Sequence, residues 1–437
     1  MEPVKIGLLG LGTVGQGTVT VLRRNAEEIM RRAGRSILVT HAAIRNLPKA
    51  EALGIKNLDL TIEPTDIVDD PSISVVVELM GGLEPARTLV LRAIDNGKHI
   101  VTANKALIAL HGNEIFAAAQ EKGVMVAFEA AVAGGIPIIK ALREGLSANR
   151  IEWLAGIING TGNFILSEMR DKGRSFEDVL EEAQALGYAE ADPTFDIEGI
   201  DAAHKLTILA SIAFGVPLQF DKVFTEGISN IAQEDVTYAS ELGYTIKHLG
   251  IAKRFDGSGI ELRVHPVLIP QKRLLANVDG VMNSVMVQAD AVGPTLYYGA
   301  GAGSAATASA VVADVIDVVR TLTSDPLNRV PHLAFQPGAL ADVPVLPIED
   351  IWSEYYLRME AEDRPGVMAD VTRILGDQGI SIEAIIQKEP ESEGTSVPVI
   401  LLSRRVREGV MNQAIERIEA LSSVTSRVTR IRVETLA

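Results

Sequence analysis

Two lysines and a group of carboxylates are the side chains of this sequence whose types and spacing could do chemistry. Residues 187–205, called the acidic stretch below, read GYAEADPTFDIEGIDAAHK, in which five acids precede Lys205. If IDAAHKLTIL is helical, Asp201 and Lys205 stand four residues apart and share one face of the helix. A second lysine, Lys105, follows the apolar run HIVTAN. A solvated acidic loop with an ordinary helix salt bridge would use the same residue types, so the surrounding sequence must decide.

A glycine-rich turn near the start of the chain indicates a nucleotide site. The segment GLGTVG at residues 10–15 follows the apolar run VKIGLLG and opens a helical pattern, which is the context that a dinucleotide-binding turn requires. Gly10 would make the tight turn, Gly12 would let the backbone approach a pyrophosphate, and Gly15 would let helix and strand pack closely. N–H groups of the first helical turn would bind the phosphates. The predicted site comprises Gly10, Leu11, Gly12, Thr13, Val14 and Gly15.

The end of the next strand decides between the two nicotinamide cofactors. An acid there holds the ribose 2′-hydroxyl of NAD, whereas an arginine accommodates the 2′-phosphate of NADP. The strand ILVTHAAIRN carries Arg45 at its end, and no acid occurs before Glu51. We therefore predict NADP in preference to NAD, with a simple cap of the sheet edge as the alternative role of Arg45.

A dinucleotide domain joined to a second domain is typical of enzymes that transfer a hydride. Reduction of a carbonyl puts negative charge on its oxygen, so a proton donor or a cation must lie there. Lys205 is one candidate, and Lys105 is another because open α/β sheets bind ligands at their strand ends. An acid such as Glu190 or Asp196 would pair with the ammonium group of an amino-acid substrate.

Composition excludes several classes of protein. The chain has 437 residues, which suggests about three domains, and its net charge of −16 argues against a nucleic-acid or anionic-membrane partner. It contains no cysteine, which rules out disulfides, thiolate metal sites and cysteine nucleophiles. No run of about 18 apolar residues occurs, so we expect no membrane span. The N-terminus resembles a strand rather than a signal peptide, and we expect a cytoplasmic protein.

Strand and helix patterns alternate in the first part of the chain. The strands VKIGLLG, ILVTHAAIR, ISVVVELMGG, HIVTAN and VMVAFEAAV are joined by helical segments, one of which runs to a C-cap at Gly34. This alternation predicts an α/β fold with a parallel sheet covered on both faces. The predicted dinucleotide-binding domain spans residues 1–135 and is completed by residues of about 300–345.

The remaining sequence predicts two further domains. Residues 136–300 are less regular, with a helix capped at Ser175, and form the predicted α+β catalytic and dimerisation domain. Five prolines between residues 324 and 350 mark a boundary. Residues 353–437 alternate as βαββαβ, the ferredoxin-like arrangement.

The acidic stretch closely resembles the signature of homoserine dehydrogenases, G-Y-x-E-x-D-P-x-x-D-x-x-G-x-D-x-x-x-K, in its glycines, tyrosine, proline, acids and lysine. The segments GLGTVG, VVVELMGG, VTANKALIA, EAAVAGGIPII, GIINGTGNF and YYGAGAGSAATASAVVAD resemble the same family. The resemblance implies interconversion of L-homoserine and L-aspartate 4-semialdehyde with a nicotinamide cofactor, in threonine, methionine and isoleucine biosynthesis.

The resemblance also implies roles for single residues. Lys205 matches the proton donor to the aldehyde oxygen, Asp201 the acid that supports it, and Glu190 the residue that grips the substrate's ammonium group. Lys105 matches a lysine near the nicotinamide and the substrate. Further matches are a substrate loop at Asn159, Gly160 and Thr161, a glycine near the cofactor at Gly303, and holders of a monovalent cation such as Na⁺ at Glu129, Val132, Gly134 and Ile136. Asp192 and Glu198 would be solvated loop residues, and His204 a surface or partner-contacting histidine.

The last domain resembles an ACT domain, the small amino-acid-sensing module, in its turn DRPG at 363–366 and its GISI at 379–382. ACT domains usually pair edge to edge, which implies a homodimer or homotetramer, and threonine is the end product that could act as effector. Glu383 stands next to the turn where the family often has Asn. A purely dimerising appendage is the alternative.

Other functions are weaker matches. Aspartate-semialdehyde dehydrogenase needs a cysteine nucleophile, which this chain lacks. A hydroxyacid dehydrogenase with an ACT domain would carry its glycine turn in mid-chain. A non-catalytic, NADP-binding amino-acid sensor is the alternative from another class, and the complete set of Lys205, Asp201 and Glu190 argues against it. Because the first strand begins so early, we expect no kinase domain ahead of it.

Overall fold

The computed structural model describes residues 2–387 and 396–436, which form two compact units. The first unit consists of Met1–Gly160, Asp201–Val223 and Val281–Val343, and the second of Thr161–Ile200, Phe224–Gly280 and Pro344–Ala437. Each unit is thus assembled from three separate stretches of chain. Within the described ranges, no helix combines the length and the apolar character that crossing a membrane requires.

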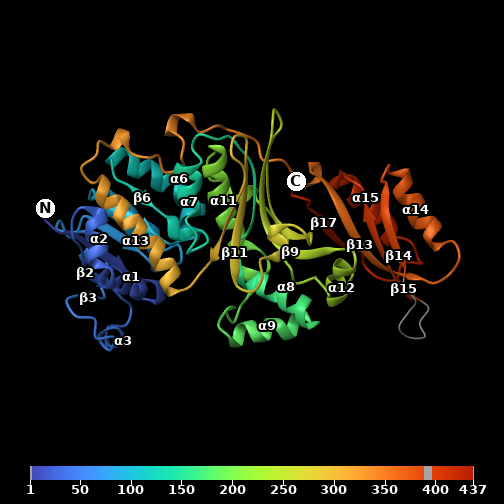
Figure 1. Cartoon of the computed structure of the whole chain (residues 1–437), viewed down its shortest axis with the longest axis horizontal. Helices are drawn as coiled ribbons and strands as arrows, with labels where there is room; N and C mark the ends of the chain where they lie inside the picture. Colours follow the sequence, from blue (N-terminus) through green and yellow to red (C-terminus); the bar gives the residue numbers. More distant parts are fainter. Residues whose placement is uncertain (1, 388–395, 437) are drawn as a thin grey trace. The chain divides into compact units, whose positions relative to one another are not determined.

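A six-stranded sheet with parallel pairing throughout forms the framework of the first unit (Figure 1). Its strand order is β3-β2-β1-β4-β5-β6, so the sheet grows in opposite directions from β1. Ligands of such sheets bind at the strand ends beside this reversal. The strands are β1 (Val4–Leu9), β2 (Ile37–Ala43), β3 (Asp59–Thr61), β4 (Val75–Glu78), β5 (His99–Thr102) and β6 (Val126–Ala127).

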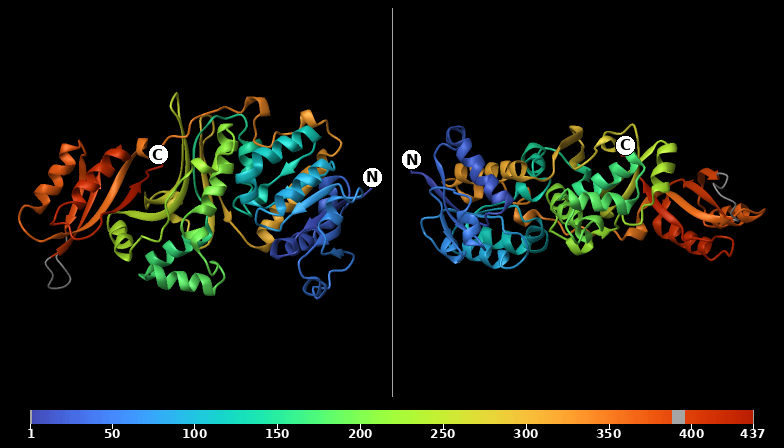
Figure 2. Two further views of the ribbon diagram at one scale, coloured as in Figure 1. Left: turned by 180° about the vertical axis from the view of Figure 1, so that it is seen from behind. Right: turned by 90° about the horizontal axis from the view of Figure 1, so that it is seen from below.

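Helices cover both faces of this sheet, as the strand–helix alternation predicts. On β1, Ile6 and Leu8 pack against residues of α1 and α13, whereas Gly7 faces Ile67 and Ile73 on the other side. Figure 1 and the left view of Figure 2, which shows the molecule from behind, place α13 and α6 on opposite sides of the sheet. The helices are α1 (Thr13–Arg24), α2 (Ala26–Ala33), α3 (Leu47–Glu51), α4 (Thr65–Val68), α5 (Ala86–Asp95), α6 (Lys105–Lys122), α7 (Ile138–Lys140) and α13 (Ser304–Thr321).

Two elements differ from the sequence prediction. The first long helix is broken at Asn25 into α1 and α2, although Gly34 closes α2 in a left-handed conformation (φ 80°), as predicted. The segment VMVAFEAAV gives only the two-residue strand β6, which is followed by a short 3-10 helix from Glu129 to Ala131. The backbone N–H of Glu129 donates to the Asp314 side chain of α13 at 2.8 Å. This N–H therefore bonds to a side chain and not to a backbone carbonyl of a neighbouring strand.

The first unit also contains an antiparallel group of strands and one long buried helix. The strands follow the order β12-β11-β7 and are β7 (Ile151–Ile157), β11 (Met282–Ala289) and β12 (Gly293–Ala300). Helix α11 (Ile200–Phe214) is buried at every position from Asp201 to Phe214. It therefore lacks the polar face of a surface helix.

The second unit combines helices with a long β-hairpin. Its helices are α8 (Gly160–Lys172), α9 (Phe176–Ala185), α10 (Thr194–Ile197) and α12 (Gln233–Glu241), and its strands are β8 (Phe224–Thr225), β9 (Tyr244–Phe255) and β10 (Gly259–Pro270). The predicted cap of α9 is confirmed, because Ser175 Oγ accepts from Asp178 N–H at 3.2 Å. Antiparallel pairing of β9 with β10 extends from Tyr244 to Pro270.

The C-terminal βαββαβ arrangement is confirmed in the described residues. It consists of β13 (Trp352–Glu362), α14 (Val367–Asp377), β14 (Ile382–Gln387), β15 (Ser396–Ser403), the short β16 (Val406–Arg407), α15 (Glu408–Glu419) and β17 (Thr429–Val433). Tyr355 and Leu357 of β13 pack with α14 and α15, whereas Tyr356 packs with Ile165 and Ile197 of α8 and α10. The sheet of this module is thus covered on both faces, and its edge strand β17 pairs in parallel with β10.

Candidate active site

Asp201 lies between the two lysines that the sequence singled out. Its Oδ2 is 2.6 Å from Lys205 Nζ, and its Oδ1 is 2.5 Å from Lys105 Nζ. Lys205 follows Asp201 by one turn of α11, as the spacing predicted, while Lys105 begins α6 directly after strand β5. The structure therefore brings together three residues from two separate elements into one cluster.

Two further groups fix the orientation of this cluster. Asn159 Nδ2 donates to Asp201 Oδ2 at 2.9 Å, and Lys205 Nζ donates to the carbonyl oxygen of Ile158 at 2.6 Å. Both come from the chain directly after β7. The sequence pattern did not identify the carbonyl of Ile158, because a backbone acceptor leaves no side-chain signal.

The electrostatics of the cluster favour an ionised Asp201. Burial alone would raise the pKa of this carboxyl, but the ammonium groups of Lys205 and Lys105 outweigh burial and hold its pKa well below the usual range. The side chains of Asp201 and Lys205 are 3% and 11% exposed, whereas that of Lys105 is 35% exposed. The cluster thus keeps the Asp201 carboxylate and the Lys205 amine almost out of water, while Lys105 is partly open to solvent.

The sequence prediction for His204 was wrong. Its ring is buried and stacks on Phe220, with 4.3 Å between the ring centroids. Burial lowers the pKa of the His204 imidazole to about 4, so this ring stays neutral at physiological pH. A surface position was expected because the residue faces away from Lys205, but α11 is enclosed on all sides.

A cavity of about 550 Å³ follows the glycine turn in the first unit. Gly10 has φ 103°, and a side chain there would lie 2.8 Å from the carbonyl oxygen of Leu79. A side chain at Gly15 would lie 2.4 Å from the carbonyl oxygen of Gly10. The turn therefore requires glycine at these two positions, and Gly10, Leu11, Gly12 and Thr13 line the cavity.

The start of α13 lies beside this turn. Ser304 Oγ donates to the carbonyl oxygen of Thr13 at 2.9 Å, and Gly17 has no room for a side chain because Ser304 lies against it. Gly303, which caps α13 with φ 112°, is thereby brought next to the first turn of α1. The predicted glycine near the cofactor is thus close to the predicted phosphate turn.

The far end of the cavity carries positive charge. Arg45 lines it, as expected for a residue at the end of β2, and so does Lys49 of α3. Asn46 caps α3 through a 2.9 Å hydrogen bond from Lys49 N–H, which fixes this turn. None of the described residues that line the cavity is acidic. Sequence reasoning missed Lys49, although a second cation so soon after the end of β2 was a usable signal.

The acidic loop, residues 187–199, belongs to the second unit. Thr161 Oγ1 donates to the carbonyl oxygen of Tyr188 at 2.7 Å, which ties the predicted substrate loop to the start of the acidic loop. The Glu190 side chain is exposed, and Asp196 lies in α10. Glu198, expected to be a solvated loop residue, is partly exposed and accepts from Ser229 Oγ at 2.7 Å.

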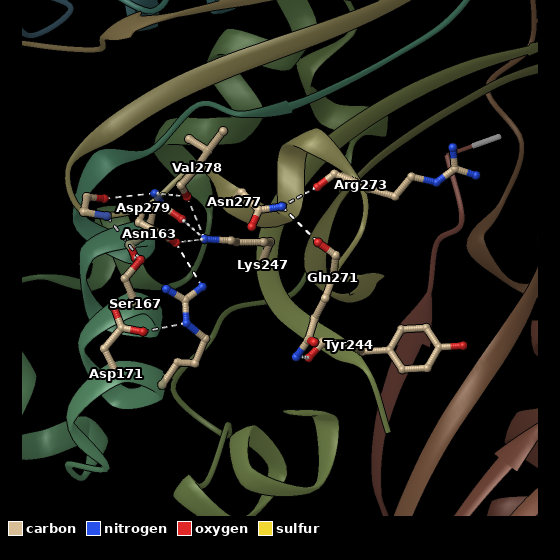
Figure 3. Close-up of polar contacts among 12 residues, drawn as sticks. Asn163, Ser167, Asp171, Tyr244, Lys247, Gln271, Arg273, Asn277, Val278 and Asp279 are labelled. Atoms are coloured by element: carbon tan, nitrogen blue, oxygen red, sulfur yellow. Dashed lines mark hydrogen bonds and ion pairs between the residues drawn. The ribbon is translucent and has the colours of Figure 1, made fainter. Parts of the chain in front are cut away.

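A buried lysine that sequence reasoning missed supports α8, the helix that begins at Gly160. Figure 3 shows Lys247 Nζ surrounded by Asn163 Oδ1 at 3.1 Å, the Val278 carbonyl oxygen at 2.6 Å and Asp279 Oδ1 at 2.9 Å. Burial lowers the pKa of Lys247, and the contact with Asp279 opposes that shift. A single lysine in the apolar run YTIKHLGIA was the signal that could have revealed it.

The predicted cation holders lie on one segment, from Glu129 to Ile136. Both carboxylate oxygens of Glu129 accept backbone N–H groups, those of Ile139 and Lys140, each at 2.8 Å. The backbone turns sharply at Ala133 and Gly134, where φ is 51° and 32°. In the described part of the chain, no three His, Asp or Glu side chains gather as metal ligands. Any cation here would therefore depend on backbone carbonyls.

Comparison with known proteins gives matches to three family models. They are described as "Homoserine dehydrogenase, NAD binding domain" for residues 10–129, "Homoserine dehydrogenase" for 137–316 and "ACT domain" for 355–423. A homoserine dehydrogenase of Pseudomonas aeruginosa is 68% identical over 437 residues, which is 100% of each chain.

Solved structures give the same result. The crystal structure of a homoserine dehydrogenase from Thiobacillus denitrificans matches with a TM-score of 0.95 and 69% identity, over 100% of this chain and 99% of that chain. A hyperthermophilic archaeal homoserine dehydrogenase in complex with NADPH matches with a TM-score of 0.63 and 26% identity, over 72% of this chain and 98% of that chain.

The buried acids Glu129 and Asp314 predict a stability that depends on pH. Burial and mutual repulsion raise the pKa of Glu129 from 4.5 to about 7, and burial raises that of Asp314 from 3.8 to about 6. Because these folded-state values exceed the unfolded ones, their stabilising contribution is complete below about pH 4 and is lost as the pH rises through 6 and 7.

We expect Asp314→Asn to reduce this loss. The amide oxygen can still accept the N–H of Glu129, while the repulsion that raises the pKa of Glu129 disappears. The melting temperature of the variant should therefore fall less than that of the parent protein between about pH 5 and pH 8. Thermal unfolding measured across that range checks the prediction, and parallel curves for the two proteins would contradict it.

Proposed function

The chain belongs to the homoserine dehydrogenase family, and we propose that it interconverts L-homoserine and L-aspartate 4-semialdehyde with NADP as cofactor. It is an oxidoreductase that acts on a CH–OH group. The observation that carries the proposal is the cluster of Lys205, Asp201 and Lys105, which offers a proton and positive charge at a strand end of the nucleotide-binding sheet.

Lys205 is the group that moves the proton. In the reducing direction its ammonium gives a proton to the aldehyde oxygen, and in the oxidising direction the neutral amine takes the proton of the homoserine hydroxyl. The nicotinamide ring supplies or accepts the hydride when it is bound. Asp201 and the carbonyl of Ile158 hold the Lys205 amine in one orientation, so one N–H can be directed at the substrate.

Asp201 and Lys105 complete the electrostatics of the reaction. The ionised Asp201 pairs with the Lys205 amine at 2.6 Å, and Asn159 Nδ2 donates to the same carboxylate and so limits its rotation. Lys105 is more open to solvent and adds positive charge where the substrate oxygen becomes negative. Two amines around one carboxylate leave a net positive charge, which favours an alkoxide-like transition state.

The acidic loop would bind the other end of the substrate. Its exposed Glu190 carboxylate is suited to pair with the ammonium group of an amino acid, with Asp196 as a second acid on the same loop. Asn159 donates to Asp201 of the cluster, and Gly160 and Thr161 follow it at the start of α8. Binding at both ends would fix the reacting carbon.

Arg45 and Lys49 support NADP over NAD. Two cations and no acid line the described wall of the cavity at the end of β2, which is the charge pattern that a 2′-phosphate needs. Gly10, Leu11, Gly12, Thr13, Val14, Gly15 and Gly303 would surround the pyrophosphate. A monovalent cation could be held by backbone carbonyls of the segment from Glu129 through Val132 and Gly134 to Ile136.

The three functional segments follow from this assignment. Residues 1–135 with about 300–345 would bind the cofactor, 136–300 would bind substrate and pair subunits into a homodimer or homotetramer, and 353–437 would regulate the enzyme. A cavity of about 360 Å³ at the turn from Asp363 to Met368 supports an amino-acid effector on the ACT domain.

Lys205→Ala should lower the turnover number for homoserine oxidation by roughly 10²-fold or more, the usual scale for a lost general acid or base. Lys205→Arg is the matched variant, because a guanidinium keeps the charge but does not release its proton at physiological pH. Both variants should remain slow, with a much smaller change in KM. Steady-state rates measured by nicotinamide absorbance check this, and near-normal turnover in Lys205→Ala would refute the assignment.

Arg45→Ala and Lys49→Ala should each raise the KM for NADP about tenfold, which corresponds to about 1.4 kcal/mol, and should leave the KM for NAD nearly unchanged. Both cations line the cavity near the 2′-phosphate position. Arg24→Ala, which removes an exposed cation at the end of α1, serves as the control. Equal changes for NADP and NAD would show that these residues do not read the 2′-phosphate.

L-threonine should inhibit homoserine oxidation if the ACT domain senses the end product. D-threonine has the same charges and composition, so it controls for ionic effects. The rate should fall as L-threonine rises and stay constant with D-threonine. A rate that does not respond to L-threonine at any concentration removes the regulatory proposal and leaves the dimerising role.

A further inference from the structure

The ACT domain and the acidic loop belong to one hydrophobic cluster of the second unit. Tyr356 and Ile431 on one face of the ACT sheet pack in the same cluster as Ile197 and Ile228, which lie at the end of the acidic loop and in the segment beside it. The edge strand β17 joins β10 in parallel, with Arg432 opposite Val267. The ACT domain is therefore built into the part of the molecule that carries the acidic loop.

A buried arginine ties these parts together. Arg432 is 0% exposed, and its Nε donates to Glu408 of the ACT domain at 2.7 Å while its Nη1 donates to Glu226 at 2.9 Å. Arg430 also approaches Glu226, at 3.4 Å. A buried guanidinium needs both carboxylates, because an unpaired charge at this depth would be strongly destabilising. Glu226 is thus the partner that Arg432 takes from outside the ACT domain.

The residues that follow Glu226 hold the end of the acidic loop. Ile228 N–H donates to the carbonyl oxygen of Ile197 at 2.9 Å, and Ser229 Oγ donates to Glu198 Oε1 at 2.7 Å. A side chain at Gly227 would lie only 2.2 Å from Glu198 Oε2, so the two segments are in direct contact. The three residues that follow Glu226 therefore contact residues 197 and 198 directly.

A second path leads from Glu226 to the same place. Its carbonyl oxygen is 3.0 Å from His248 Nε2, and the His248 ring lies against Gly199, where a side chain would be 3.1 Å from the ring. Burial lowers the pKa of His248 to about 4, so the ring is neutral and donates to this carbonyl. Gly199 is the last residue of the loop, and α11 with Asp201 and Lys205 follows in the chain.

We propose that Glu226 is a positioning residue for substrate binding, through which Arg432 of the ACT domain fixes the acidic loop that carries Glu190. The inference rests on the proposed function, because it assigns the loop to the ammonium end of the substrate. Glu226 contacts no reacting atom. Its effect is on how well the loop is held in its binding conformation, and so on KM rather than on proton transfer.

Glu226→Gln is the test variant, and Asp235→Asn is its matched control. Asp235 is 0% exposed and also pairs with the ACT domain, through Arg358 at 2.6 Å and Tyr356 at 3.0 Å. It lies on α12, and the hydrogen bonds of its carboxylate go to no residue of the acidic loop. Glu226 is 29% exposed and lines a cavity of about 580 Å³, so an amide there can be solvated and the variant should fold.

In Glu226→Gln, the KM for homoserine should rise by at least about fivefold, the lower end of coupling between sites, while the turnover number changes less than about twofold. Asp235→Asn should keep the parent KM although it lowers the melting temperature at least as much. Equal KM changes in the two variants would assign the effect to lost stability and would overturn the proposal.

Hydrogen–deuterium exchange provides a readout that does not depend on the substrate. Backbone amides of residues 187–199 should exchange faster in Glu226→Gln than in the parent protein and in Asp235→Asn. If the parent protein does not oxidise homoserine, the proposed function fails, yet this measurement still tests the role of Glu226.

Ser229→Ala is a second test variant for the case that Glu226→Gln does not fold. Ser229 is exposed, and its substitution removes the hydrogen bond to Glu198 while the ion pair between Arg432 and Glu226 stays intact. It should raise KM and loop exchange in the same direction by a smaller factor. Unchanged KM and unchanged exchange in the variants that fold would overturn the proposal.

Discussion

The arrangement of the first unit depends on one shared charge. Asp201 stands between two ammonium groups, and without it the buried amine of Lys205 would lose the carboxylate that pairs with it at 2.6 Å, which is strongly destabilising for a buried charge. The three residues come from α6 and α11, and the Asn159 and Ile158 contacts come from the end of β7. The cluster therefore exists only when elements from separate parts of the chain are all in place.

The same physical rule recurs in the second unit. Lys247 and Arg432 are buried cations, and each is surrounded by acceptors that belong to segments distant in sequence. Lys247 connects β9 to α8 and to the chain around Asp279, while Arg432 connects the ACT domain to Glu226. Burying charge adds little net stability, but it penalises every arrangement in which the partners separate. In this molecule such cations lie where loops must keep one position.

Local patterns in the sequence were sufficient for the framework and for part of the site. The turn at Gly10 and the spacing of Asp201 and Lys205 are short-range features, so their geometry follows from one strand end and one helical turn. The position of Lys105 followed from its place after a parallel strand.

Contacts between distant residues were beyond such patterns. Glu129 meets Asp314, which lies 185 positions later, and this contact ends β6 earlier than its apolar sequence suggests. His204 was misplaced because the face of α11 that points away from Lys205 was assumed to be solvated. The helix is in fact buried from Asp201 to Phe214. Isolated charges in apolar runs, such as Lys247, are the signals that a sequence analysis can use for this class of contact.

The pairing of β17 with β10 has a consequence for the order in which the protein is made. Two strands pair with the same edge of β10: β8 near Arg263 and β17 near Val267. The ribosome releases β10 more than 150 residues before β17, since these strands span Gly259–Pro270 and Thr429–Val433. During that interval an apolar strand edge is open to other nascent chains, which is a setting for misassociation.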